Sequence, residues 1–496
     1  MKRFVYFTLL CALVSCEIKA QGSYEEFKKK VEGEYSSFKK NRDKEFEDFR
    51  NKVNKEYASL LKKTWEEFNA FKGVPMPEED KPVPPVVYPE EDKDKPIKDN
   101  PQPFEEIVPI VKPEPQPEPI VPIKETPKPP VEVYYAFKFF NTPLKVRLEN
   151  KHRFTLQGCD EKEISRVWGV LSRSSYNNAL NDCLAIRSQN KLCDWAYLQM
   201  LQTLSEAFLG EHSNESVLLT AFLYCQSGYK MRLASADNSL FLLYASNHMI
   251  YNKSYWEIEG EKFYPLNCNL DQLHICQVTY PKEKPLSLQI GTEQLLALQS
   301  SAQRSLQSKR YQDVKAVVNT NKNLIEFFDS YPSSIINDDF GTRWAMYANT
   351  PMSRQAKNSL YPDLKKTISG KSQLDAVNRL LNFVQTAFVY EYDDKVWGCD
   401  RAFFADETLY YPYCDCEDRS ILFSRLIRDL LGLKVVLIYY PGHLATAVSF
   451  TEEVSGDYIS MNGMRYTICD PTYIGAPVGA TMPKMDNGKA KVILLE

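Results

Sequence analysis

Three residues near the C-terminus have the types and the order of a thiol nucleophile, a general base and a residue that orients the base. Cys416 lies in an Asp-Cys-Glu-Asp-Arg-Ser run, His443 follows Tyr-Pro-Gly, and Asp470 precedes a proline. The chain has only five histidines among 496 residues, and His443 is the last of them. We therefore expect thiol-based chemistry from these three side chains.

The residues after Cys416 predict a helix that carries the sulfur at its N-terminus. Apolar residues between 421 and 431 recur at helical spacing, and Gly432 is a typical C-terminal cap. The unpaired N–H groups and the positive dipole end of a helix start favour a thiolate. Acidic neighbours oppose it, because negative charge raises a thiol pKa. We expect His443, as an imidazolium, to supply the compensating positive charge.

The segments after this helix predict antiparallel strands. The apolar run 435–440 is short enough for a buried strand, and a tight turn leads from it into an apolar segment that begins at His443. A third segment, 464–469, follows an Asn-Gly hairpin signal and ends at Asp470. Adjacent strands would place His443 and Asp470 side by side, facing the helix start.

The stretch from about 373 to 494 resembles the transglutaminase-like superfamily, in which a Cys at a helix start meets His and Asp on following strands. The Cys-Glu-Asp run at 416–418 is similar to the signature of bacterial transglutaminase-like cysteine peptidases. The helical segment 374–386 is similar to the helix before their catalytic Cys. Cys414 departs from the pattern, since these proteins commonly have Gly there, which leaves open a disulfide or a steric change beside the nucleophile.

The resemblance implies Cys416 as nucleophile, His443 as base and then acid, and Asp470 as the residue that holds the imidazole tautomer. The Cys416 N–H would be one oxyanion donor, and Tyr411 and Tyr413 are both candidates for the other. The implied reaction is acyl transfer through a thioester, with water as the acceptor and envelope proteins or peptidoglycan peptides as substrates. Two alternatives stay open: a protein-glutamine cross-linking acyltransferase, and a non-catalytic tethered binding or scaffold protein.

Charge and cysteine spacing exclude several other classes. The net charge is −4 and the pI about 6.0, so we expect no nucleic-acid partner. No Cys or His pair has zinc-ligand spacing, and we expect neither a metal nor another cofactor. In an oxidising compartment the possible disulfides are Cys183 with Cys193, Cys268 with Cys276, and Cys399 with Cys414.

The N-terminus predicts export. Two basic residues precede the apolar run 4–14, which is too short to span a bilayer. Processing has two interpretations: a lipobox with a lipidated Cys16, or a signal peptide 1–20 cleaved between Ala20 and Gln21. Either way we expect a protein of the bacterial periplasm, outer membrane or cell surface, soluble or anchored to the membrane by lipid.

Residues 23–73 predict a long amphipathic helix, because large residues recur every eleven positions in two series, one starting at Tyr24 and one at Phe27. A period of roughly 3.67 residues per turn keeps such a stripe nearly straight. We expect a stalk that forms a homo-oligomer through residues 23–72. Binding at a lipid interface is the alternative, although the opposite face carries balanced charge.

The rest of the chain predicts an α+β protein in several parts. Residues 74–131 hold 18 of the 30 prolines, which favours an extended, semi-rigid linker. An accessory α+β domain, a helical connector and the transglutaminase-like catalytic domain follow, at 132–290, 291–367 and 368–496. In the accessory domain, Asn214 precedes a helix-like run and strands in the same order as Cys416 does. It is therefore a candidate for a degenerate second copy.

Overall fold

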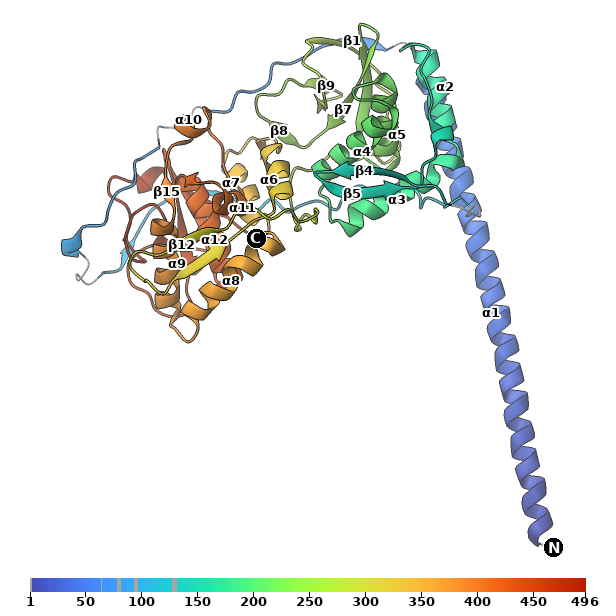
Figure 1. The fold of residues 1–496 in the computed structure, drawn as a ribbon, viewed down its shortest axis with the longest axis horizontal. Helices are drawn as coiled ribbons and strands as arrows, with labels where there is room; N and C mark the ends of the chain where they lie inside the picture. Colours follow the sequence, from blue (N-terminus) through green and yellow to red (C-terminus); the bar gives the residue numbers. More distant parts are fainter. Residues whose placement is uncertain (1, 64, 78–81, 93–96, 127–131) are drawn as a thin grey trace.

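The structure is a computed structural model that describes residues 2–63, 65–77, 82–92, 97–126 and 132–496. Within these ranges, side chains are described from residue 26 on, apart from residues 92 and 174. Two bodies of mixed helix and sheet lie next to each other, and one long helix projects away from them (Figure 1). The predicted α+β class is therefore confirmed for the described residues.

The predicted stalk helix ends earlier than residue 73. Helix α1 (Lys2–Leu60) is followed by strand β1 (Glu66–Asn69), which pairs with β11 (Gln272–Ile275). The Phe71 ring stacks on Tyr255 with centroids 5.4 Å apart. The last aromatic repeat thus finds partners on the accessory sheet, and this tertiary packing overrides helix propensity.

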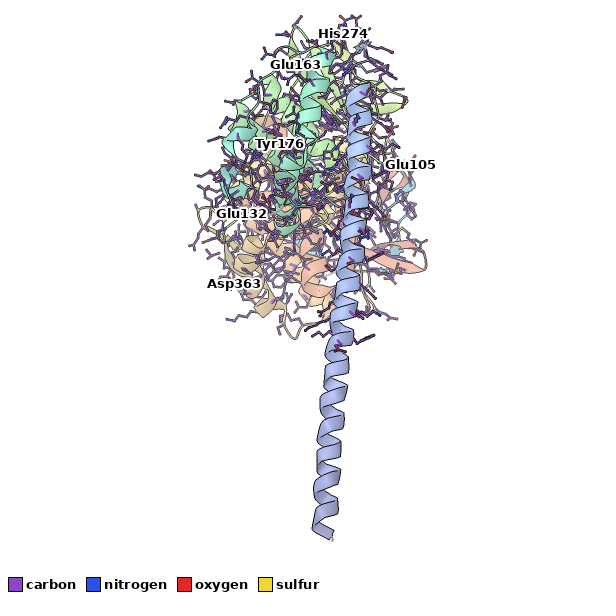
Figure 2. All side chains as sticks on the ribbon, turned by 90° about the vertical axis from the view of Figure 1, so that its right-hand side faces the viewer. Glu105, Glu132, Glu163, Tyr176, His274 and Asp363 are labelled. Carbon is purple, nitrogen blue, oxygen red and sulfur yellow. The ribbon has the colours of Figure 1, made fainter. Side chains whose placement is uncertain are left out.

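The end of α1 also packs within the chain. Tyr57 and Leu61 are buried, and the Tyr57 ring lies 5.1 Å from that of Trp168. Figure 2 shows this part of α1 beside the body of the molecule and its N-terminal part extending beyond it. Phe27, Tyr35 and Phe38 are more than 60% exposed. We predicted an oligomer contact along residues 23–72. Because the end of this segment packs within the chain, only the exposed aromatic residues nearer the N-terminus remain available for such a contact.

The Pro-rich segment is extended, as predicted, but it is not a free spacer. Its two short strands, β2 (Asn100–Pro101) and β3 (Glu106–Val108), join opposite edges of the C-terminal sheet. Farther along it passes the accessory region, where a Cβ at Gly228 would lie 2.1 Å from the Glu118 carbonyl oxygen. We call this segment the strap, because it runs across both bodies. Its prolines fit at the sheet edges, where the N–H that proline lacks is not needed for pairing with a further strand.

The accessory region has four helices and a six-stranded sheet in the order β1-β11-β6-β7-β10-β9. Among them, α5 packs on β6 and β7. The helices are α2 (Glu161–Leu171), α3 (Asn177–Gln189), α4 (Asp194–Leu209) and α5 (Asn214–Gln226). The remaining strands of the region are β4 (Tyr135–Phe139), β5 (Thr142–Val146), β6 (Met231–Ala236), β7 (Ser239–Ala245), β8 (His248–Ile250), β9 (Trp256–Ile258) and β10 (Glu261–Pro265).

The predicted helical connector is neither purely helical nor a separate part. Its elements are β12 (Arg304–Gln307), β13 (Lys315–Val318), α6 (Lys322–Asp329), β14 (Ser334–Ile336), α7 (Gly341–Asn349) and α8 (Arg354–Ile368). Helices α7 and α8 pack on helices of the C-terminal body, so the predicted boundary at residue 368 cuts through a packed core. The contacts that join these elements to the C-terminal body are between segments distant in the chain, which local sequence patterns do not reveal.

The C-terminal body packs helix α12 (Cys416–Leu431) on a seven-stranded sheet in the order β2-β19-β20-β18-β17-β21-β3. The five central strands pair antiparallel: β17 (Lys434–Tyr440), β18 (His443–Ser449), β19 (Asp457–Met461), β20 (Met464–Cys469) and β21 (Lys491–Leu494). Covering elements are α9 (Gln373–Ala387), β15 (Val389–Tyr390), α10 (Asp393–Val396), α11 (Ala405–Tyr410) and β16 (Tyr413–Cys414).

Three further predictions concern cysteines and the membrane. All ten cysteines from Cys159 onwards are free thiols, so none of the three candidate disulfides is formed. Within the described ranges, no helix combines the length and the apolar character needed to cross a bilayer. Processing at Cys16 or at Ala20 falls where the structure does not describe side chains, and it stays a prediction.

Candidate active site

Helix α12 begins at Cys416, as the spacing predicts, and a capping box fixes its first turn. The Asp415 carboxylate accepts hydrogen bonds from the N–H groups of Glu417 (3.1 Å) and Asp418 (3.4 Å). Asp418 in turn accepts one from the Asp415 N–H, at 3.1 Å. The sulfur therefore sits at a well-ordered helix N-terminus, the position that stabilises a thiolate.

His443 and Asp470 meet across neighbouring strands. His443 is the first residue of β18, Asp470 directly follows β20, and the two strands pair antiparallel. His443 Nε2 lies 2.9 Å from Asp470 Oδ2, and both side chains are buried. Asp470 Oδ1 accepts hydrogen bonds from the N–H groups of Thr472 and Tyr473, which fixes the carboxylate. Asp470 is thus placed to hold one tautomer of the imidazole.

The second ring nitrogen of His443 has no such partner. Nδ1 is buried and makes no hydrogen bond with any part of the chain that the structure describes. If Nε2 carries the proton that Asp470 accepts, then Nδ1 has a lone pair available for a proton. His443 can therefore act as a base toward a group in the same cavity.

Buried side chains tie the three elements of the site together. Arg419 on α12 donates to the backbone carbonyls of Gln385 (3.2 Å) and Phe388 (3.0 Å) at the end of α9. Gln385 donates to the Asp470 carbonyl oxygen, at 3.0 Å, and accepts from the Gly475 N–H. Because α9 contacts both the helix start and the Asp470 loop, it sets their relative position.

Cys416 and His443 line one cavity of about 450 Å³ between α12, α10 and the turn before β18. Its walls carry more acid than base: one lysine, Lys395, faces five carboxyl groups. These belong to Asp393, Asp394, Asp400, Asp415 and Glu417. A substrate group that carries positive charge would be attracted to the carboxylates that no arginine pairs, above all the exposed Asp394.

Asp415 and Asp418, which lie next to Cys416 in the chain, destabilise a thiolate less than two carboxylates would. Burial, and secondarily the neighbouring carboxylates, raise the pKa of Asp415 well above its usual value. The same two causes raise the pKa of Asp418. Each raised pKa favours the neutral acid, which exerts no repulsion on a sulfur anion. The capping box therefore orders the helix start at a reduced electrostatic cost to Cys416.

An arginine from outside the predicted site residues lies behind this wall. Arg343 of α7 is fully buried, 2.6 Å from Asp400 and 3.5 Å from Glu417. Glu417 also accepts a hydrogen bond of 2.5 Å from Trp344 Nε1. Oxygens of Asp393, Asp400 and Glu417 lie within 4.8 Å of one another, a spacing that could hold a cation. The arginine already supplies positive charge there.

The two tyrosines predicted as oxyanion donors lie away from this cavity. Tyr411 donates its hydroxyl to Asp329 at 2.9 Å, and Tyr413 is 41% exposed; neither lines the cavity. Tyr390 does not line the cavity either, but it lies nearer to the sulfur: burial raises the pKa of its hydroxyl, and the nearby Cys416 adds to the rise. Its hydroxyl makes no hydrogen bond with the described residues. In the sequence, Tyr390 could have been found from the strand-like Phe-Val-Tyr run at 388–390, which follows the predicted helix.

The strap reaches the same cavity. Pro82 lines it, and the Val83 N–H donates to the Gly442 carbonyl oxygen at 2.9 Å, one residue before His443. Farther on, Val86 and Tyr88 exchange backbone hydrogen bonds with Ile474 of the Asp470 loop. The Pro-rich segment therefore runs beside both loops that carry the base and its partner.

Comparison of the chain with protein-family models, with curated proteins and with solved structures finds no match in any of the three. The resemblance to the transglutaminase-like superfamily therefore rests on the sequence motifs alone.

Proposed function

We propose that the C-terminal body is a cysteine hydrolase of transglutaminase-like type, which cleaves peptide or amide bonds through a thioester at Cys416. One observation supports this most: His443 directs Nε2 to Asp470 and has an unbonded Nδ1 in a cavity that Cys416 also lines. A purely structural histidine of this burial would be expected to bond through both nitrogens.

The chemistry proceeds in two stages. His443 takes the proton of the Cys416 thiol, and the thiolate attacks the amide carbonyl carbon, forming a C–S bond. The C–N bond then breaks as His443 returns the proton to the leaving amine. Water, deprotonated by His443, attacks the thioester; a C–O bond forms, the C–S bond breaks, and the acid and the thiol are released. Asp470 stabilises the imidazolium in both stages.

A second reaction is favoured by the acidic wall. An amine could take the place of water, and Asp394 at the exposed rim of the cavity would attract its ammonium group. This is the cross-linking acyltransferase that the sequence left open. It uses the same Cys416 thioester, so the two reactions differ only in the acceptor.

The setting we propose is the cell envelope, with proteins or peptidoglycan peptides as substrates. The export signal in residues 1–20 and the resemblance of the Cys-Glu-Asp run to bacterial peptidases support it. The stalk and the strap would hold the catalytic body to an oligomer or a lipid anchor.

Acid-quench mass spectrometry of the acyl-enzyme tests this function. The full chain is mixed with an acetylated casein digest and with a peptidoglycan stem peptide, quenched in acid and weighed intact. The proposal expects an adduct on Cys416 that neutral hydroxylamine removes and that Cys416→Ala abolishes. Transfer of a fluorescent primary amine into casein would favour the acyltransferase. The absence of any adduct with either substrate would favour the non-catalytic scaffold.

A further inference from the structure

The accessory sheet repeats the connectivity of the C-terminal sheet. In the C-terminal body, α12 leads into β17, and the five antiparallel strands lie in the order β21-β17-β18-β20-β19. In the accessory region, α5 leads into β6, and five antiparallel strands lie in the order β11-β6-β7-β10-β9. Taken in chain order, each strand of one set has a counterpart in the other. Each helix also packs on the first two strands that follow it.

The helix starts correspond as well. Cys416 is the first residue of α12, after the cap Asp415, and Asn214 is the first residue of α5, after the cap Ser213. Ser213 accepts from the Ser216 N–H, as Asp415 accepts from the Asp418 N–H. Asn214 thus occupies the position of the nucleophile, where the sequence led us to look for a degenerate copy.

Strand register gives the counterpart of the base. The β17–β18 hairpin closes with Tyr440 opposite His443, across a two-residue turn. The β6–β7 hairpin closes with Ala236 opposite Ser239, also across two residues. The first residue of the second strand is therefore His443 in one body and Ser239 in the other.

The third position follows from the next strand pair. In the C-terminal sheet, Thr446 lies opposite Cys469, and Asp470 follows. The matching position on β7 is Leu242, which accepts a hydrogen bond from the Leu266 N–H at 3.0 Å. Asn267 comes next and so takes the place of Asp470. The three active-site positions become Asn214, Ser239 and Asn267.

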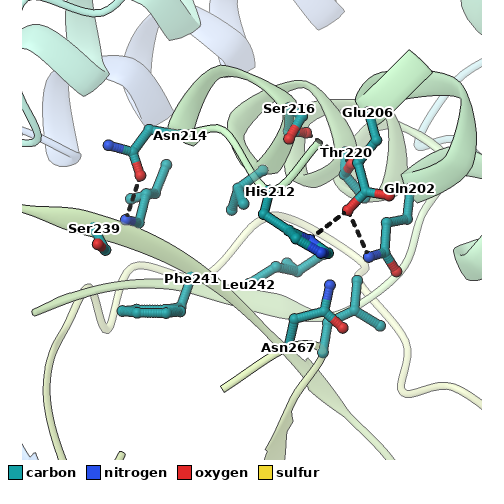
Figure 3. Close-up of a pocket in the computed structure, with 13 residues that line it drawn as sticks. Gln202, Glu206, His212, Asn214, Ser216, Thr220, Ser239, Phe241, Leu242 and Asn267 are labelled. Atoms are coloured by element: carbon teal, nitrogen blue, oxygen red, sulfur yellow. Dashed lines mark hydrogen bonds and ion pairs between the residues drawn. The ribbon is translucent and has the colours of Figure 1, made fainter. Parts of the chain in front are cut away.

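These three residues line one cavity of about 160 Å³, as their counterparts Cys416 and His443 line theirs. Figure 3 shows Asn214 and Ser239 at one side of it and Asn267 at the other. Asn214 Oδ1 accepts from the Leu240 N–H at 2.8 Å, and its Nδ2 donates to the Asn238 carbonyl oxygen. Asn214, at the position of Cys416, has a side-chain amide and no thiol. The accessory site therefore has the arrangement of the C-terminal site but lacks its nucleophile.

The rest of the lining is suited to binding. Glu206 accepts hydrogen bonds from Gln202 and His212, both at 3.0 Å, and it is the only carboxylate in the lining (Figure 3). No lysine or arginine belongs to the lining set, and Phe241 and Leu266 supply apolar surface. The side-chain amides and hydroxyls can donate and accept hydrogen bonds, and the Glu206 carboxylate can accept them, which suits a neutral amide or an amine. An anionic side chain would meet Glu206, and His212, the one basic residue of the lining, already pairs with that carboxylate.

We infer that the accessory region is a second, non-catalytic copy of the C-terminal core, and that its cavity binds one neutral or amine-bearing side chain of a peptide. The peptide class rests on the proposed function, since it is carried over from the Cys416 cavity. The side-chain preference comes from the accessory cavity itself. The molecule would then hold a peptide at one copy and process a peptide at the other.

Saturation-transfer NMR on the full chain with Cys416→Ala and Asp394→Trp tests the binding without turnover, because Asp394→Trp obstructs the exposed rim of the Cys416 cavity. The probes are acetylated and amidated Gly-Gly-Xaa-Gly-Gly peptides with Gln, Lys, Leu or Glu at Xaa. The inference expects transfer to the Gln or Lys peptide and none to the Glu peptide. Asn267→Trp, on the exposed rim, should abolish it, and Glu257→Trp, exposed on β9, should not. Transfer to no peptide, or transfer that survives Asn267→Trp, would overturn the binding site.

Rebuilding the three residues tests the correspondence separately. Asn214→Cys, Ser239→His and Asn267→Asp are combined with Cys416→Ala and with Cys159→Ser, because Cys159 Sγ lies 3.0 Å from Asn214 Nδ2. Iodoacetamide should then label position 214 about tenfold faster than in the chain without the new histidine and aspartate. Equal rates would overturn the correspondence, while failure of the native site at Cys416 would leave this comparison unchanged.

Discussion

His443 Nε2 lies 2.9 Å from Asp470 Oδ2, and two backbone N–H groups hold the other oxygen of that carboxylate. An acceptor fixed in this way selects the tautomer that has its proton on Nε2. The lone pair on Nδ1 is then available to a group in the cavity. This relationship supports the base role that we propose for His443. Under that proposal, the negative charge of the Asp470 carboxylate is needed as well as its size.

Asp470→Asn should reduce turnover by about 10²–10⁴-fold with little loss of stability. Asparagine keeps the oxygen that Thr472 and Tyr473 contact but presents an N–H to His443, which favours the opposite tautomer. Steady-state hydrolysis of the peptide found in the acyl-enzyme experiment measures the effect. Asp486→Asn, on a surface turn of the same body, is the control. Equal activity of the two variants would remove Asp470 from the mechanism.

Tyr390→Phe should slow formation of the acyl-enzyme by about 10²–10³-fold, the effect of losing one oxyanion donor. It should leave the labelling of Cys416 by iodoacetamide unchanged, because alkylation develops no oxyanion. Single-turnover mass spectrometry and a labelling time course supply the two readouts. Tyr413→Phe is the matched comparison. If it lost acylation while Tyr390→Phe kept it, the donor predicted from the sequence would be the right one.

Val83→Pro should raise the labelling rate of Cys416 about threefold to tenfold, because it removes the N–H that ties the strap to Gly442. With that bond lost, Pro82 would leave the cavity more often. Val87→Pro is the control, since the Val87 N–H takes part in none of the strap bonds described above. An unchanged or slower rate in Val83→Pro would show that the strap does not limit access.

The local parts of the site were predictable from the sequence, because they depend on neighbours along the chain. Asp415 and Asp418 form the helix start, Gly432 adopts the left-handed conformation that ends α12, and the Asn-Gly pair closes the β19–β20 hairpin. Short connections account for the β17–β18 and β19–β20 hairpins. The pairing of β18 with β20 and the place of β21 beside β17 depend on contacts that local sequence does not encode.

The misses came from contacts between distant segments. Phe68 and Phe71 continue a helical pattern, yet β11 and Tyr255 draw them into a sheet. Arg343 enters the active site from a region that was assigned as a connector. Proline density correctly predicted an extended segment, but composition does not encode which surface that segment covers.

Stability should fall between pH 5 and pH 8. Burial raises the pKa of Glu407 to about 7 and that of Asp406 to about 6, both above their ordinary values. The folded state therefore binds more protons than the unfolded state in this window, and the stabilisation present at low pH is lost as pH rises through these folded values. For Glu407 alone the loss would be roughly 3 kcal/mol.

Thermal melts of wild type and Glu407→Gln at pH 5 and pH 8 measure this loss. The variant should show the smaller difference between the two pH values, because its side chain does not titrate. Glu105→Gln, at an exposed position, should behave as wild type. If the melting temperature of Glu407→Gln changed with pH as much as that of the wild type, Glu407 would not be the source of the stability loss.

A short neutral-pH pulse of iodoacetamide followed by intact-mass analysis tests the central claim, an activated thiolate at Cys416, most directly. The claim predicts rapid single labelling of the wild type, loss of that label in Cys416→Ala, and labelling slowed about tenfold or more in His443→Ala. Labelling of Cys416 no faster than that of the other nine thiols from Cys159 onwards, or labelling that His443→Ala does not slow, would contradict it.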